Sequence, residues 1–97
     1  MLKLYVFVLK SLSLPQQAVQ AGHAVSKIAS QNPKIDWSNQ TFVYLRASAV
    51  QLKRLLLGRN NNDPTYSYFI EPDYDHKLTA VAVFGKDNEY KTYRLIQ

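Results

Sequence analysis

The sequence predicts a single α/β domain over residues 1–97, built as a sandwich with a mixed four- to five-stranded sheet and flanking helices. Strand-like and helix-like segments follow the order β-α-β-α-β-β, which favours parallel pairing across the crossovers and an antiparallel final hairpin. Ninety-seven residues are enough for one hydrophobic core but not for two. The hydrophobic fraction of 46% is ordinary for a globular protein.

The first predicted strand, residues 2–10, is apolar on both faces. Its alternate residues are Leu4, Val6 and Val8 on one face and Tyr5, Phe7 and Leu9 on the other. A strand that is apolar on both faces belongs in the middle of a sheet.

The first predicted helix spans Leu14–Gln31. Pro15 suits its first turn, and Asn32-Pro33 ends it because the residue before proline avoids the α conformation. At about 100° per residue, the small and apolar residues share one face: Ala18, Ala21, Gly22, Val25, Ile28 and Ala29. We expect the opposite face to carry a polar stripe formed by Gln16, Gln20, His23 and Lys27.

A polar loop around Trp37, residues 34–40, leads to a second strand at 41–46 and a second helix at 48–58. Ser48 and Gln51 form a capping-box pattern at the start of this helix, and Gly58 is a typical stop. Its buried face is predicted to contain Ala49, Leu52, Leu55 and Leu56.

The last part of the chain predicts a hairpin. Residues 65–70 and 78–84 form its strands, and the acidic segment EPDYDHK at 71–77 forms its turn. Residues 92–96 can add a short edge strand.

Composition narrows the functional classes. The absence of cysteine excludes disulfides and thiol catalysis, and no apolar run is long enough to span a bilayer, so we expect a soluble, cytoplasmic protein without a signal peptide. The net charge of +5 favours a polyanionic partner such as nucleic acid, with simple solubility as an equal alternative. Phosphate-loop, zincin and nucleophile-elbow motifs are absent. His23 and His76 with Asp73 or Asp75 match no standard metal spacing, so we expect neither metal nor cofactor.

Ligand sites in α/β sheets gather at the carboxyl ends of parallel strands, where the first helix begins. This places Gln16, Gln20 and His23 near that edge, and Thr79 with the turn 71–75 can face them if the last strand starts there. His23 would then act as a base or as a donor to an anion. The alternative is that these residues have no role in a site. The helix residues would then be solvated, the acidic residues would form a turn around Pro72, and Thr79 would reflect ordinary strand propensity.

Two segments resemble the type 2 peptidyl-tRNA hydrolase family of archaea and eukaryotes, and especially its short relatives. The segment QAVQAGHAVSKIA is similar to the AAQ-x-x-HA signature of the family's first helix, through Ala18, Gln20, His23 and Ala24. A strand that ends in a basic residue, here Lys10, precedes it, and Trp37 follows it. FIEPDYDHKLTAVAV resembles the EPD…LTA segment of the short relatives.

The resemblance implies a mixed sheet with flanking helices, often dimeric, that binds the acceptor end of tRNA and hydrolyses the ester joining a peptide to its terminal ribose. It implies no membrane and no DNA partner. It assigns catalytic roles to Gln20, His23, Asp73 and Thr79, with Glu71 as the alternative acidic residue. Lys10, Gln16, Lys27 and Glu71 are the expected substrate-binding residues.

The chain departs from the family at one place. The enzymes carry lysines before the AAQ core, where this chain has Pro15, Gln16 and Gln17, so Lys10 or Lys27 would have to replace them. Two further hypotheses therefore stay open. One is a non-catalytic RNA-binding module that uses Lys53, Arg54, Lys91 and Arg94. The other is a protein–protein adaptor with a tyrosine-rich sheet face.

Overall fold

The computed structural model describes residues 3–34, 42–60, 63–85, 90 and 94–95. The predicted order of elements is confirmed. The strands are β1 (Lys3–Leu9), β2 (Phe42–Ala47), β3 (Tyr66–Glu71), β4 (Lys77–Gly85) and β5 (Arg94–Leu95), and the helices are α1 (Leu14–Gln31), α2 (Ala49–Leu56) and the short 3-10 helix η1 (Pro72–Tyr74). The predicted loop around Trp37 lies outside the described residues, apart from Lys34.

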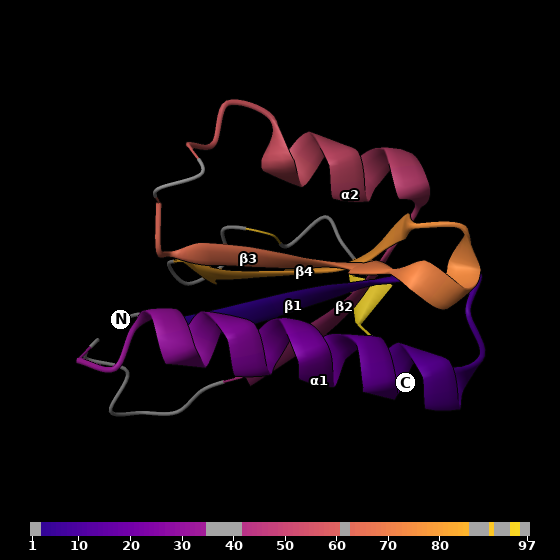
Figure 1. Cartoon of the computed structure of the whole chain (residues 1–97), viewed down its shortest axis with the longest axis horizontal. Helices are drawn as coiled ribbons and strands as arrows, with labels where there is room; N and C mark the ends of the chain where they lie inside the picture. The colour runs from indigo at the N-terminus through magenta and orange to yellow at the C-terminus, as the bar shows by residue number, and fades with distance from the viewer. Residues whose placement is uncertain (1–2, 35–41, 61–62, 86–89, 91–93, 96–97) are drawn as a thin grey trace.

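The sheet is mixed and has the strand order β3-β4-β1-β2-β5. β1 lies at its centre, as predicted, and pairs in parallel with β2 and antiparallel with β4. β3 and β4 form the expected antiparallel hairpin, and β5 pairs antiparallel with β2 as a short edge strand. Because α1 and α2 cover opposite faces, the molecule has three layers (Figure 1).

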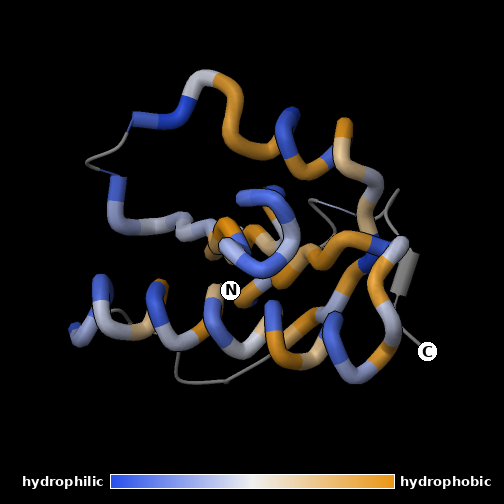
Figure 2. The backbone as a smooth tube through the Cα atoms, turned by 45° about the vertical axis from the view of Figure 1, so that its right-hand side comes forward, coloured by the Kyte–Doolittle hydropathy of each residue, from blue (hydrophilic) through white to orange (hydrophobic). Residues whose placement is uncertain are grey.

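The two faces of β1 build two separate cores. Leu4, Val6 and Val8 pack with Ala24 and Ile28 of α1. On the other face, the main buried residues are Tyr5, Phe7, Leu9, Leu52 and Leu55. Hydrophobic residues therefore concentrate along the central strands, whereas the helices alternate between hydrophobic and hydrophilic residues (Figure 2).

The predicted orientation of α1 is wrong by part of a turn. The buried residues are Gln17, Gln20, Ala21, Ala24 and Ile28, whereas Ala18, Gly22 and Ala29 are exposed. Small side chains bury little area and therefore fix the rotation of a helix weakly. The polar partners of Gln20, described below, instead bring that side chain inside.

α2 follows the predicted capping pattern. The Ser48 side chain accepts a hydrogen bond from the Gln51 backbone at 3.1 Å, and the Gln51 side chain accepts one from the Ser48 backbone at 2.8 Å. Leu52 and Leu55 are buried as expected, but Ala49 is exposed. Gly58 follows the helix with a φ of +76°, a conformation that favours glycine.

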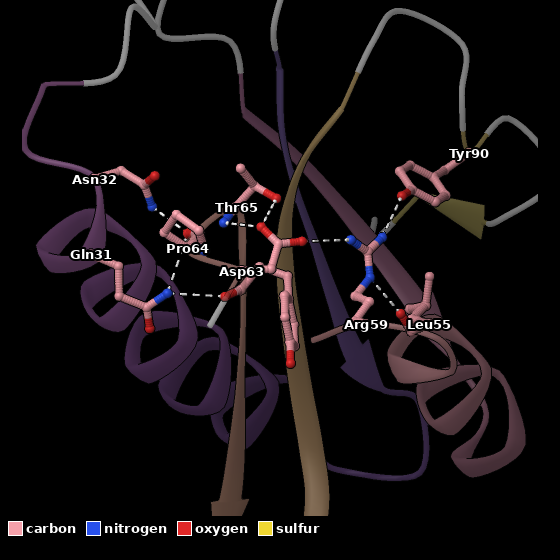
Figure 3. A network of polar contacts seen from close by, with 9 residues as sticks. Gln31, Asn32, Leu55, Arg59, Asp63, Pro64, Thr65 and Tyr90 are labelled. Atoms are coloured by element: carbon pink, nitrogen blue, oxygen red, sulfur yellow. Dashed lines mark hydrogen bonds and ion pairs between the residues drawn. The ribbon is translucent and has the colours of Figure 1, made fainter. Parts of the chain in front are cut away.

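The segment after α2 is fixed by a polar network around Asp63 (Figure 3). Asp63 accepts hydrogen bonds from the backbone and the hydroxyl of Thr65 at 2.9 and 2.6 Å. Arg59 lies 3.9 Å from the Asp63 carboxylate and donates to the Tyr90 hydroxyl at 3.4 Å. The network therefore connects the end of α2 to the start of β3 and to the segment after β4.

Candidate functional site

The site begins with an irregularity in β4. Phe69 of β3 pairs with Ala80, but the next residue, Ile70, pairs with Leu78, so Thr79 is an extra residue in the strand. Regular alternation would place Thr79 on the α2 face, with Val81 and Val83. The bulge instead lets Thr79 join the α1 face, because an extra residue re-aims the side chain that it carries.

Thr79 and Gln20 form a buried polar contact between β4 and α1. The Thr79 hydroxyl donates to Gln20 Oε1 at 2.7 Å, and it also lies 3.2 Å from the carbonyl oxygen of Phe69. Gln20 is 1% exposed and Thr79 is fully buried. Such buried polar groups must be hydrogen-bonded, since an unpaired one costs about 1–3 kcal/mol.

Gln20 also donates a hydrogen bond to a carboxylate. Its Nε2 donates to Glu71 Oε2 at 3.2 Å, while Glu71 Oε1 accepts from the backbone N–H of Asp73 at 3.4 Å. Both carboxylate oxygens of Glu71 are thus held, and the carboxylate fixes which way the Gln20 amide points. We call Thr79, Gln20 and Glu71 the polar relay. It joins β4, α1 and β3.

The polar relay shows which of two acidic residues contacts Gln20. Glu71 and Asp73 were both possible acidic residues, and the structure brings Glu71 to Gln20. Asp73 lies in η1 with an exposed side chain. The predicted meeting of Gln20, Thr79 and the acidic turn is therefore observed, with Glu71 as the acid in contact.

His23 lies one turn after Gln20 on α1 and is exposed. Its ring stacks on Phe69 with a centroid distance of 4.3 Å and an interplanar angle of 14°. Within the described residues, neither ring nitrogen has a hydrogen-bond partner. The stacking therefore holds the ring against β3 while its nitrogens stay accessible to a ligand. Phe69 was not singled out in the sequence, where it reads as an ordinary strand residue.

Lys27 of the polar stripe and Gln31, one turn further along α1, are exposed, but both side chains contact the outer edge of β3. Lys27 Nζ lies 3.4 Å from the carbonyl oxygen of Tyr68 and 4.7 Å from the centre of its ring. Gln31 Nε2 lies 3.0 Å from the carbonyl oxygen of Tyr66 and 3.2 Å from that of Pro64. These contacts occupy acceptors that an edge strand would otherwise offer to another chain.

Lys10 and Gln16 lie at the predicted end of the sheet but outside the polar relay. Lys10 is exposed, and its backbone N–H donates to Ala47 at 2.9 Å. Gln16 is half-buried, and its backbone N–H donates to the Ser13 side chain that caps α1. Gln17 is buried and donates to the Leu12 carbonyl at 2.8 Å. The first turn of α1 therefore presents no cation to the site.

The turn between η1 and β4 contains two consecutive residues with positive φ, Asp75 at 54° and His76 at 58°. Neither is glycine, so this conformation costs about 1–3 kcal/mol for each residue. The sequence indicated a turn here but gave no signal for this backbone conformation.

Among the described residues, no group of three or more His, Asp and Glu side chains is arranged to hold a metal ion. In the same part of the chain, no helix combines the length and the apolar character needed to cross a membrane. No protein-family model matches the chain, and no curated protein matches it.

Proposed function

We propose that the protein hydrolyses an ester bond between a peptidyl or aminoacyl group and tRNA. The observation that carries this proposal is the polar relay, in which the buried Thr79 hydroxyl donates to the Gln20 amide and Gln20 donates to the Glu71 carboxylate. The exposed His23 lies one helical turn after Gln20 on α1. Polar groups held by neighbours from three elements are preorganised, and preorganisation is what electrostatic catalysis requires. The resemblance in the first helix and the EPD…LTA segment supplies the substrate class.

The proposed reaction assigns one step to each side chain. The Glu71 carboxylate accepts a proton from water as the water oxygen bonds to the ester carbonyl carbon. His23 donates a hydrogen bond to the carbonyl oxygen, where negative charge develops. The C–O bond to the ribose then breaks, and the proton passes to the ribose oxygen. Gln20 and Thr79 are positioning residues, since Gln20 donates to the carboxylate and Thr79 donates to Gln20.

Several parts of the proposal concern partners. The acceptor end of tRNA is the expected ligand, and a substrate of this kind places the protein in the cytoplasm. We also propose a homodimer, in which the exposed Tyr44, whose ring lies 4.6 Å from that of Phe42, would contribute to the contact. Lys10 and Gln16 would contact substrate from the loop and first turn before the polar relay, whereas Lys27 would have to leave the edge of β3 to do so.

The test is hydrolysis of an N-blocked aminoacyl-tRNA by the purified protein, with a free-ester blank. We expect His23→Ala to abolish turnover and Glu71→Gln to lower kcat by about a hundredfold or more. Asp73→Asn is the matched control, because it removes an equal charge two residues away and should retain most of the activity. Equal losses in the two acidic variants would contradict the role of Glu71, and full activity of His23→Ala would overturn the mechanism.

A second candidate function is RNA binding without catalysis. The observation that favours it is the lack of a cation in the first turn of α1, where Gln17 is buried against the loop. Loss of a cation beside a developing oxyanion reduces the rate by orders of magnitude. In this case tRNA would bind but not be hydrolysed, and the affinity would fall with salt at a log–log slope of about 0.7–0.9 for each phosphate contacted.

A further inference from the structure

A pocket of about 370 Å³ lies at the same end of the sheet as the polar relay but is lined from the α2 side. Leu9 at the end of β1, Ala49 at the start of α2 and Leu78 of β4 form its apolar walls. The carboxyl ends of parallel strands meet at this edge, which is where α/β sheets bind ligands. The volume is within the range of small-molecule sites.

Every polar side chain among the residues that line the pocket can donate a hydrogen bond. Lys53 of α2, His76 of the turn and Lys77 of β4 converge on it, together with the hydroxyl of Ser11. No carboxylate lines it, and Asp75, next to His76 in the chain, is not among the lining residues. Across the described ranges, neither Lys53 nor Lys77 has an ion-pair partner, so their charges are available to a ligand.

The backbone gives His76 its place in the pocket. Both Asp75 and His76 adopt the left-handed conformation, which glycine adopts most easily and which Asn, Asp and His adopt more often than other residues do. This conformation lowers the stability of the fold, and strained residues of this kind cluster at binding sites. Lysines, an imidazole and a hydroxyl in an apolar recess are groups that recognise phosphate oxygens.

We propose that this pocket binds the phosphate group of a nucleotide. Lys53 and Lys77 supply the charge, while Ser11 and His76 supply further hydrogen-bond donors. The pocket is separate from the polar relay. Leu78 lines the pocket on the α2 face of the sheet, whereas its neighbour Thr79 contacts Gln20 on the α1 face. The inference does not depend on ester hydrolysis.

The test is an NMR titration of the full chain with 5′-AMP at low salt, with adenosine as the uncharged comparison. AMP should shift the amide signals of Ser11, Ala49 and Leu78, and adenosine should not. Lys53→Gln and Lys77→Gln should each weaken AMP binding by about tenfold or more. The matched control is Arg54→Gln, which removes the same charge from the neighbouring position of α2, outside the pocket, and should have little effect.

His76→Gly separates binding from folding. It should raise Tm by relieving the left-handed conformation and yet weaken AMP binding, whereas Asp75→Gly should raise Tm without weakening it. Equal binding of AMP and adenosine, or equal losses in Lys53→Gln and Arg54→Gln, would overturn the proposal. The variants His23→Ala and Glu71→Gln should bind AMP normally. A failure of the proposed esterase would therefore appear in their hydrolysis measurements and would leave the AMP titration unchanged.

The phosphate can belong to a free nucleotide or to the end of a tRNA. A competition experiment distinguishes the two sources, and either result supports the pocket. Displacement of AMP by deacylated tRNA would assign the phosphate to the nucleic acid. Retention of AMP in saturating tRNA would assign it to a free nucleotide.

Discussion

The hydrogen bond from Thr79 to Gln20 is the more deeply buried of the two bonds in the polar relay. It is short, at 2.7 Å, and both partners are buried. Water cannot replace either partner there, so loss of the hydroxyl leaves an amide oxygen unpaired. The contact also holds α1 against the β4 bulge.

We expect Thr79→Val to destabilise the protein by about 1–3 kcal/mol, because valine keeps the shape of threonine but cannot donate to Gln20. Thr79→Ser keeps the hydroxyl and should lose less. Urea unfolding of the parent protein and the two variants measures the differences in unfolding free energy, provided that the dependence on urea concentration (m) is the same for all three. A serine variant less stable than the valine variant would show that packing, and not the hydrogen bond, dominates at this position.

At the scale of elements, α2 depends on its surroundings. Its eight residues are too few to form a stable helix alone. The capping box and the burial of Leu52 and Leu55 therefore hold it on the sheet. Since α2 also carries Lys53, its stability bears directly on the phosphate pocket.

We expect Ser48→Ala to lower the free energy of unfolding by about 1 kcal/mol, because an N–H in the first turn of α2 loses its acceptor. Ser48→Asp is the control, since aspartate caps helices as well as serine does. Urea denaturation monitored by far-UV circular dichroism gives both values. Equal losses in the two variants would rule out capping as the cause.

The elements themselves were predictable from the sequence, whereas the orientation of α1 was not. Pro15 and Asn32-Pro33 set its bounds, and the two apolar faces of β1 indicated a central strand. The burial of Gln20 depends on Thr79, 59 residues away, which reaches it through an unpaired residue in β4. No local pattern indicates such a bulge. The covering of the β3 edge by Lys27 and Gln31 is likewise a tertiary contact.

For the whole molecule, the network around Asp63 joins the end of α2 to the start of β3, and Arg59 extends it to Tyr90, 31 residues away. Its hydrogen bonds from the Thr65 hydroxyl and backbone, aided by the charge of Arg59, lower the pKa of its carboxyl below the ordinary value of 3.8. A carboxyl whose pKa is lower in the folded state than in the unfolded state stabilises the fold at pH values above the unfolded-state pKa. This contribution disappears as the pH falls through the folded-state pKa.

We expect Asp63→Asn to lower Tm at pH 7, and the difference from the parent protein to shrink below about pH 4. Asparagine retains an oxygen that accepts from Thr65, so the comparison reports mainly the charge. Thermal unfolding at pH 7 and at pH 3 measures both differences. A gap in Tm that stays constant across this range would contradict the role of the ionised carboxylate.

The extra residue in β4 has a consequence for how such a site can arise. Without Thr79, Leu78 and Ala80 would be consecutive and would already pair in register with Ile70 and Phe69. Both would keep their present faces, so the hydrophobic layers would be unchanged. Insertion or deletion of the single codon for Thr79 would therefore add or remove the partner of Gln20. The packing of the hydrophobic core would not have to change.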